Sequence, residues 1–370
     1  MFAASCNAAG KFPPGFRFGA ATSSYQVEGA WNVSDKTPSV WDKFAHENPE
    51  LISDRSNGDV ACDSYHLWEE DVAIAKKIGL HFYSEYFKGN CTLFAMYKIE
   101  AKFDFFQNVL VNDTNAGPSK VGLTNNHIWY EAGTPDYEEK TELARNLAAI
   151  YAHPIYSKKG GWPANVEKYI KKKSKEEGYP RSKLPAFTRE EIEFVRGTFD
   201  YYGINYYTSR LVFPEENITG PYNFWPIFGS RELGITLKPD PSWKAGHEWL
   251  VSYPAGLRKQ LIWLVQQYGD IEIKILENGF STRDREMNDL DRIEYYKDHL
   301  EQVLLSIKED GLNITAYTAW SLMDNYEWIG GYTSKFGLTD VDFEDPKRKR
   351  TLRASASYYA AVIKKHSINV

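Results

Sequence analysis

Glu277 stands where a predicted β-strand ends. The run IEIKILENGFS alternates apolar and polar residues, so its apolar side chains share one face of that strand: Ile271, Ile273 and Ile275. Asn278 and Gly279 follow the acid in a turn. A glutamate with a purely structural role lies more often on a helix surface, so this position favours a chemical role. Acid chemistry of this kind usually uses two carboxyl groups, and a second acid is therefore expected.

Amide, tyrosine and tryptophan side chains also lie just after other predicted strands. Gln26 follows the run FRFGAAT, and the run FDYYGINYYT contains Asn205 and Tyr207. The run WSLMDNYEWIGGY adds three further candidates: Trp320, Glu327 and Trp328. Pyranose rings stack on tryptophan faces, and their hydroxyl groups hydrogen-bond carboxylates and amides. Core packing explains any one of these residues best, but their recurrence at successive strand ends favours a sugar site.

Strands alternate with helices along most of the chain, which favours a parallel sheet. The predicted strands include residues 16–22, 80–83, 120–126, 199–208 and 271–277. Helical periodicity is clear in DSYHLWEEDVAIAKKIGL, which Gly79 ends, and in AGLRKQLIWLVQQYG. The chemical residues follow strands, as they do at the C-terminal face of a (β/α)8 barrel, so we favour that α/β fold over a doubly wound sheet. No G-x-G-x-x-G or Walker loop follows a strand, which counts against a nucleotide cofactor.

Composition excludes several classes of protein. A length of 370 residues suits one large barrel or two modest domains, and we interpret residues 1–370 as a single domain. The net charge of −6 argues against nucleic-acid and anionic-membrane partners, and no apolar run is long enough to span a membrane. The 3 cysteines lack CxxC spacing and the histidines lack H-x-x-x-H spacing, so we expect no metal and no cofactor.

Five Asn-x-Ser/Thr sequons favour an extracellular, glycosylated protein, although so short a motif also arises by chance. They begin at Asn32, Asn90, Asn112, Asn217 and Asn313. Residues 1–11 are rich in small residues but have no apolar core, so they read as the stub of a signal peptide or as a frayed terminus.

Six long motifs follow one another along the chain. They are FGAATSSYQVEGAWN, DSYHLWEEDVAIAKKIGLHFY, AHPIYSKKGGWP, RSKLPAFTREEIEFVRGTFDYYGINYYTS, ILENGF and AWSLMDNYEWIGGYTSKFGLTDVDF. Together they resemble glycoside hydrolase family 1, and most of all its secreted β-glucosidases and myrosinase-like enzymes. The resemblance covers residues 12–83 and 121 to about 365, in family order. It implies a (β/α)8 TIM barrel and retaining hydrolysis of a small-molecule β-glucoside.

The resemblance also implies roles for individual residues. Glu277 matches the nucleophile, Tyr207 matches the tyrosine that hydrogen-bonds it, and Asn205 opens the same motif. The positions that match substrate contacts are Gln26 and Glu327 for sugar hydroxyls, Trp320 for ring stacking, Trp328 for a further contact, and Phe336 with Lys335 near the outer edge of the sugar.

The chain departs from the family in residues 84–120. The family carries its acid/base glutamate in an Asn-Glu-Pro motif at the end of strand four, and this motif is absent from the sequence. The strand-two arginine and the strand-three histidine are also missing, so we expect an incomplete barrel that lacks strands three and four. Glu85, Glu100 and Asp104 lie in this segment without a strand-end context, and we interpret them as surface residues.

Three interpretations stay open at this stage. The first is a β-glucosidase-type hydrolase with impaired activity. The second is a catalytically dead family member that binds a sugar or a protein. The third is that the missing segment reflects a skipped exon or a faulty gene model, and that the working protein is longer. A barrel that lacks two strands exposes sheet edges, so self-association is also expected.

Overall fold

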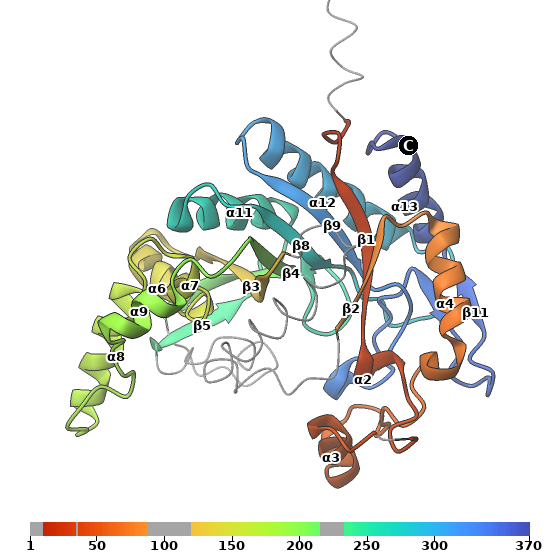
Figure 1. Ribbon diagram of the computed structural model, residues 1–370, viewed down its shortest axis with the longest axis horizontal. Coiled ribbons are helices and arrows are strands. Elements are labelled where there is room, and N and C mark those ends of the chain that lie inside the picture. Colours follow the sequence, from red (N-terminus) through yellow and green to blue (C-terminus); the bar gives the residue numbers. More distant parts are fainter. Residues whose placement is uncertain (1–9, 35, 87–119, 215–232) are drawn as a thin grey trace, which may run out of the picture. The chain divides into compact units, whose positions relative to one another are not determined.

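A computed structural model describes residues 10–34, 36–86, 120–214 and 233–370, which fall into two compact units (Figure 1). The first unit contains the described residues up to Val121, together with 276–301 and 315–370. The second unit contains residues 122–275 and 302–314. The chain therefore passes from one unit to the other inside strands β8 and β9 and inside helix α12.

The first unit is built on strands in the order β2, β1, β9, β8. Their bounds are β2 Phe82–Tyr86, β1 Arg17–Ser23, β9 Ile314–Trp320 and β8 Ile273–Asn278. Strand β1 pairs in parallel with both β2 and β9, and Ala21 lies opposite Trp320. The other elements are α2 (Ser24–Val27), α3 (Val40–Glu47), η1 (Pro49–Leu51), α4 (Ser64–Ile78), α12 (Leu290–Lys308), η5 (Trp328–Gly330), β10 (Thr339–Val341), β11 (Arg350–Leu352) and α13 (Ala354–Lys365).

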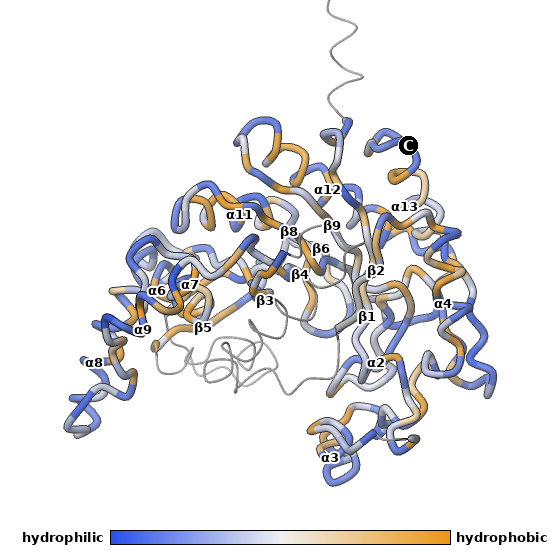
Figure 2. The backbone as a smooth tube through the Cα atoms, in the orientation of Figure 1, coloured by the Kyte–Doolittle hydropathy of each residue, from blue (hydrophilic) through white to orange (hydrophobic). Residues whose placement is uncertain are grey.

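The second unit has the strand order β8, β4, β3, with β5 added to β4. Strands β3 (Gly122–Ala132) and β4 (Tyr201–Pro214) are parallel, whereas β5 (Ile235–Lys238) is antiparallel to β4. The helices are η3 (Pro135–Tyr137), α6 (Glu138–Ala148), α7 (His153–Tyr156), α8 (Ala164–Glu176), α9 (Arg189–Val195) and α11 (Pro254–Tyr268), and the short strands β6 (Lys244–Ala245) and β7 (Val251–Ser252) form a ribbon. Figure 2 shows a hydrophobic β5 and a hydrophilic outer end of α8.

Local sequence explains most of these elements. Helix α4 ends at Ile78 because Gly79 takes a left-handed conformation at its C-cap, as predicted. Helix α11 buries the predicted face, which includes Leu257, Leu261 and Leu264. The sequence prediction ended β3 at residue 126 and β4 at residue 208, but both strands run six residues further. The extension of β3 contains the buried run from His127 to Tyr130, which a strict alternation rule does not recognise.

Two strands are paired on one side only within the described part of the chain. Strand β2 pairs with β1 alone and ends the sheet, and β3 pairs with β4 alone. These two strands flank residues 87–119 in the sequence. The place where the family has strands three and four therefore falls outside the described residues, and so do Glu100 and Asp104. Glu85 belongs to β2. Self-association through open edges stays a prediction.

A buried ionic network organises the loop that follows β9 in the first unit. Asp324 accepts two hydrogen bonds from Arg353, of 2.9 and 2.6 Å, and both side chains are fully buried. Asp340 accepts a further bond of 3.0 Å from the same guanidinium. Asp324 also accepts a hydrogen bond from the backbone N–H of Gly337. The network therefore ties the loop after β9 to β10 and to the start of α13.

We expect Asp324→Asn to lower the free energy of unfolding by about 3–5 kcal/mol, because it leaves the buried Arg353 charge without its main counterion. Urea unfolding of the 370-residue chain measures this change. Arg189→Met is the matched control, since Arg189 forms an exposed pair with Glu193 whose loss costs less than about 1 kcal/mol. Equal losses in the two variants would show that the network does not hold the loop.

Candidate active site

The ends of three strands in the first unit bring the predicted sugar-site residues together. Gln26 lies in α2, which directly follows β1, Glu277 lies on β8, and Trp320 is the last residue of β9. Strands β1 and β9 are hydrogen-bonded neighbours, and β8 lies next to β9. This arrangement explains why polar residues placed far apart in the sequence reach one edge of the sheet.

Trp320 and Glu327 form the central hydrogen bond of the site. The indole Nε1 of Trp320 donates to Oε1 of Glu327 over 3.1 Å. The backbone N–H of Glu327 donates to the carbonyl of Gly331 over 2.7 Å, which fixes the start of η5. The peptide bond between Trp320 and Ser321 is cis. The carboxyl group is thus held beside an indole ring at the end of β9.

Gln26 is buried and joins the loop after β9 to the end of β1. Its side-chain Nε2 donates to Oδ1 of Asn325 over 2.8 Å and to the carbonyl of Tyr326 over 2.9 Å. The backbone N–H of Tyr326 donates in return to the carbonyl of Gln26. Both amide protons are therefore engaged, which leaves the amide oxygen of Gln26 as the atom that can accept a hydrogen bond from a sugar hydroxyl.

Aromatic rings form an apolar wall beside this cluster. Trp328 stacks on Tyr25 with ring centroids 6.2 Å apart and packs against Trp41 at 4.7 Å. Trp328 has a positive φ of 54°, a conformation that ordinary residues seldom adopt. Its ring remains partly exposed, as a residue that contacts a ligand must be.

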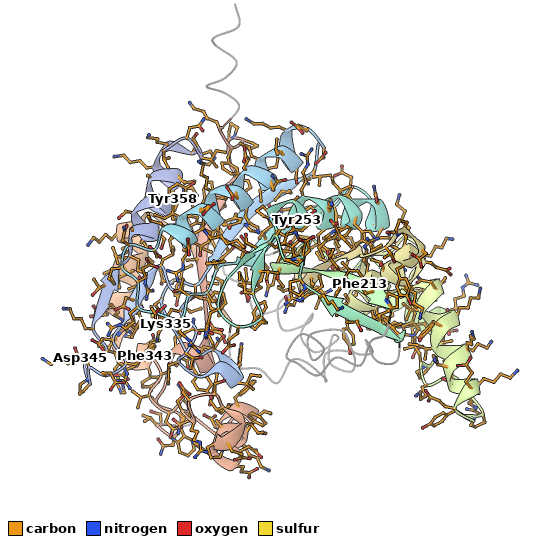
Figure 3. All side chains as sticks on the ribbon, turned by 180° about the vertical axis from the view of Figure 1, so that it is seen from behind. Phe213, Tyr253, Lys335, Phe343, Asp345 and Tyr358 are labelled. Carbon is orange, nitrogen blue, oxygen red and sulfur yellow. The ribbon has the colours of Figure 1, made fainter. Side chains whose placement is uncertain are left out.

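Phe336 and Lys335 belong to the same unit. The carbonyl of Phe336 accepts a hydrogen bond of 3.3 Å from the backbone N–H of Ser321, so Phe336 lies close to the end of β9. Burial lowers the pKa of Lys335, whose Nζ lies 4.7 Å from the ring centre of Phe343 (Figure 3). Lys335 also exchanges two backbone hydrogen bonds with Thr282, a few residues beyond Glu277.

Glu277 influences the protonation of Glu327. Burial raises the pKa of Glu327 to about 8, the hydrogen bond from Trp320 opposes this shift, and the negative charge of Glu277 adds to it. Glu327 keeps partial exposure to solvent, yet at neutral pH it is mostly protonated. Glu277 is also partly exposed. The neighbouring Gly279 leaves room for the carbonyl of Trp320, which a Cβ would approach to 1.9 Å.

Asn205 and Tyr207 lie on β4 in the second unit. Tyr207 is buried edge-on against Trp249, with ring centroids 5.9 Å apart. Asn205 lies opposite Asn126 on β3, and its buried Oδ1 has no hydrogen-bond partner among the described residues. The hydrogen bond expected between Tyr207 and Glu277 stays a prediction.

Sequence reasoning missed three residues that shape the site: Asn325, Tyr25 and Trp41. Asn325 positions Gln26, while Tyr25 and Trp41 hold Trp328. Tyr25 precedes Gln26 and Asn325 precedes Tyr326, each inside one of the six motifs. Their place in those motifs was therefore the signal that the sequence offered. Trp41 lies outside the motifs and offers no such signal.

The described residues contain no group of His, Cys, Asp or Glu side chains that could hold a metal ion. Within the same part of the chain, no helix is long and apolar enough to cross a membrane.

We expect Glu277→Gln to lower the pKa of Glu327 below about 8, because the substitution removes a nearby like charge. A ¹³C NMR titration of glutamate side-chain carboxyl groups measures the shift, with Glu327→Gln used to assign the signal. Glu301→Gln, on the exposed face of α12, is the matched control and leaves the value unchanged. An unaltered Glu327 titration in the Glu277→Gln chain would contradict the coupling.

Several known proteins resemble this chain in both sequence and fold. Myrosinase 1 of Brevicoryne brassicae is 30% identical over 466 aligned residues, which cover 95% of this chain and 98% of that protein. The cytosolic beta-glucosidase of Homo sapiens is 29% identical, with 96% and 99% covered. The solved structure of aphid myrosinase superposes with a TM-score of 0.84 at 29% identity, covering 96% of this chain and 99% of that one. The expected (β/α)8 class is thereby confirmed.

The same alignments locate the departure from the family. They run over 466 or more positions although this chain has 370 residues, so the relatives carry residues that have no counterpart here. The model of glycosyl hydrolase family 1 matches residues 8–85 and 104–368, and its gap falls inside the segment that the motifs identified as anomalous. Nearly all of the remaining chain is matched, and the chain belongs to glycosyl hydrolase family 1.

Proposed function

We propose that this chain cleaves β-glucosides with retention of configuration, that Glu277 is its nucleophile, and that it works without a general acid of its own. The observation that carries the proposal is the cluster at the strand ends of the first unit. There a carboxylate on β8 lies within the electrostatic influence of Glu327, which hydrogen-bonds Trp320 at the end of β9. A relative named as a cytosolic beta-glucosidase supports the same substrate class.

Glu277 performs the bond-forming step in this mechanism. Its carboxylate oxygen attacks the anomeric carbon of the glucoside, and the bond to the aglycone oxygen breaks with the electron pair leaving on that oxygen. Water then attacks the anomeric carbon of the glucosyl ester and gives up a proton to solvent. The bond from that carbon to Glu277 breaks, which restores the carboxylate and releases glucose with its original configuration. Trp328, which adopts a positive φ, and the rings packed against it form an apolar surface next to the bound sugar.

Glu327 is protonated when it orients the sugar. At neutral pH its raised pKa keeps the carboxyl group mostly neutral, so it both donates and accepts hydrogen bonds. Because Glu327 is neutral, Glu277 carries the one negative charge of this pair and can act as the nucleophile. The amide oxygen of Gln26 accepts a bond from a second hydroxyl group.

The missing acid/base group determines which glucosides react. Retaining enzymes place a second carboxyl group about 5–5.5 Å from the nucleophile to protonate the leaving oxygen. The sequence lacks the Asn-Glu-Pro motif that carries it in the family. Loss of a general acid typically lowers the rate about 10²- to 10⁴-fold. The rate falls most for glucosides whose aglycone needs a proton in order to leave.

We expect kcat/KM to fall steeply as the pKa of the leaving group rises, from 2,4-dinitrophenyl β-glucoside to methyl β-glucoside. Initial rates for a series of aryl and alkyl glucosides measure the slope, after subtraction of spontaneous hydrolysis. Glu277→Gln removes the reaction of every substrate, whereas Glu301→Gln, on the exposed face of α12, leaves the series unchanged. A flat series would mean that the chain has an efficient general acid, and no turnover of any glucoside would favour a protein that only binds sugar.

We also propose that the protein is secreted and carries N-linked glycans. Two of the five sequons begin at described residues, and both asparagines are exposed: Asn32 in a turn and Asn313 just before β9. Exposed turns are accessible to the glycosylation machinery.

The glycan proposal predicts that the chain secreted from eukaryotic cells loses mass when it is treated with an N-glycan amidase. Asn32→Gln and Asn313→Gln each remove one increment of that loss, since each deletes one acceptor. Mass spectrometry of the intact protein measures the increments. Recovery of the chain only from the cytosol, with an unmodified mass, would contradict both secretion and glycosylation.

A further inference from the structure

A groove in the second unit lies between two helices and the strand that they cover. Helices α6 and α11 both pack against β3 (Figure 1). Side chains of these three elements line a cavity of about 390 Å³. Its walls combine the indole rings of Trp129 and Trp263 with Ile262. It contains none of the residues assigned to the candidate active site.

The charged groups of this groove are already paired. Nη1 of Arg145 lies 2.7 Å from a carboxylate oxygen of Glu138 and 3.0 Å from one of Glu142. Nζ of Lys259 donates to the carboxylate of Glu131. Because each cation has a carboxylate beside it, the groove offers an anion little net attraction, and a neutral ligand suits it better.

The polar walls are held in place by hydrogen bonds. Nε1 of Trp263 donates to both carboxylate oxygens of Glu142 over 3.1 and 3.2 Å. Nε1 of Trp129 donates to Glu131, which also accepts a bond of 3.0 Å from the hydroxyl of Tyr253, a residue labelled in Figure 3. The guanidinium of Arg145 lies 4.3 Å from the ring centre of Trp129. The two indole rings are therefore preorganised, so that a ligand need not order this part of the groove.

Two amide groups remain available. Gln266 and Gln267 line the groove from α11, and the side chains of both make no hydrogen bond within the described residues. Each amide offers two donor protons and one acceptor oxygen at a fixed spacing. Two neighbouring amides beside an apolar wall, in a cavity whose cations are paired with carboxylates, match a sugar ring, which has hydroxyl groups around its rim and C–H groups on its faces.

We propose that this groove is a second, non-catalytic site that binds a neutral hexopyranoside. It holds the sugar through the amides of Gln266 and Gln267 and places the sugar's C–H face against Ile262 and the indole edges. A volume of about 390 Å³ accommodates a single sugar ring with its bound water. The proposal does not depend on hydrolysis, because no residue of the groove takes part in it.

The test uses a diazirine-bearing β-glucoside as a photoreactive probe on the full 370-residue chain, followed by peptide mapping. We expect adducts in residues 138–146 and 259–267, and we expect excess methyl β-glucoside to suppress them. The double variant Gln266→Ala, Gln267→Ala lowers these adducts roughly tenfold, since two hydrogen bonds to the ligand are lost. Adducts in peptides that contain Glu327 stay unchanged in this variant.

Gln302→Ala, on α12, is the matched control and retains full labelling of the groove. A shared thermal unfolding midpoint shows that the variants are folded. Labelling that spares 138–146 and 259–267, or that persists in the double variant, would overturn the proposal. Labelling that methyl β-glucoside fails to suppress would overturn it as well, because adhesion of the photoreactive group alone would then explain the adducts.

Discussion

The contact between Arg353 and Asp324 anchors the loop that follows β9, and this loop carries much of the candidate site. Both side chains are fully buried, and Asp324 directly precedes Asn325, which holds Gln26 at the end of β1. The same aspartate binds the backbone of Gly337, next to Phe336. A buried ion pair adds little net stability compared with apolar packing, but an unpaired charge in its place is very costly. The pair therefore specifies one conformation for the loop that carries Glu327 and Trp328.

That constraint has an electrostatic consequence at the strand ends. The loop keeps the carboxyl group of Glu327 beside the indole of Trp320 and near the charge of Glu277. Burial and that charge raise the pKa of Glu327 to about 8, against the opposing effect of the hydrogen bond from Trp320. In the proposed mechanism the two acids take different roles: Glu277 is the carboxylate that attacks carbon, and Glu327 is a neutral hydrogen-bonding group. The same mechanism assigns no residue to protonation of the aglycone, because the sequence lacks the Asn-Glu-Pro motif.

Much of this arrangement could be predicted from the sequence, and the reasons differ between elements. Glu277 was found because the alternation of Ile271, Ile273 and Ile275 ends at it, and Gly79 identified the end of α4. The full lengths of β3 and β4 were missed because buried parallel strands lose their alternation. The partners of Arg353 were not predictable, since a contact between positions 29 residues apart leaves no local pattern. The roles assigned to Asn205 and Tyr207 stay predictions, as they lie on β4 in the second unit.

Covalent trapping of Glu277 tests the central claim most directly. The chain is incubated with 2,4-dinitrophenyl 2-deoxy-2-fluoro-β-glucoside, whose leaving group needs no proton and whose fluorine slows the release of the sugar. Peptide mapping by mass spectrometry then locates the ester. We predict one 2-deoxy-2-fluoroglucosyl group on Glu277 and none in the Glu277→Gln chain. An ester on another carboxylate, or no ester on a folded chain, would contradict the assignment of Glu277 as the nucleophile.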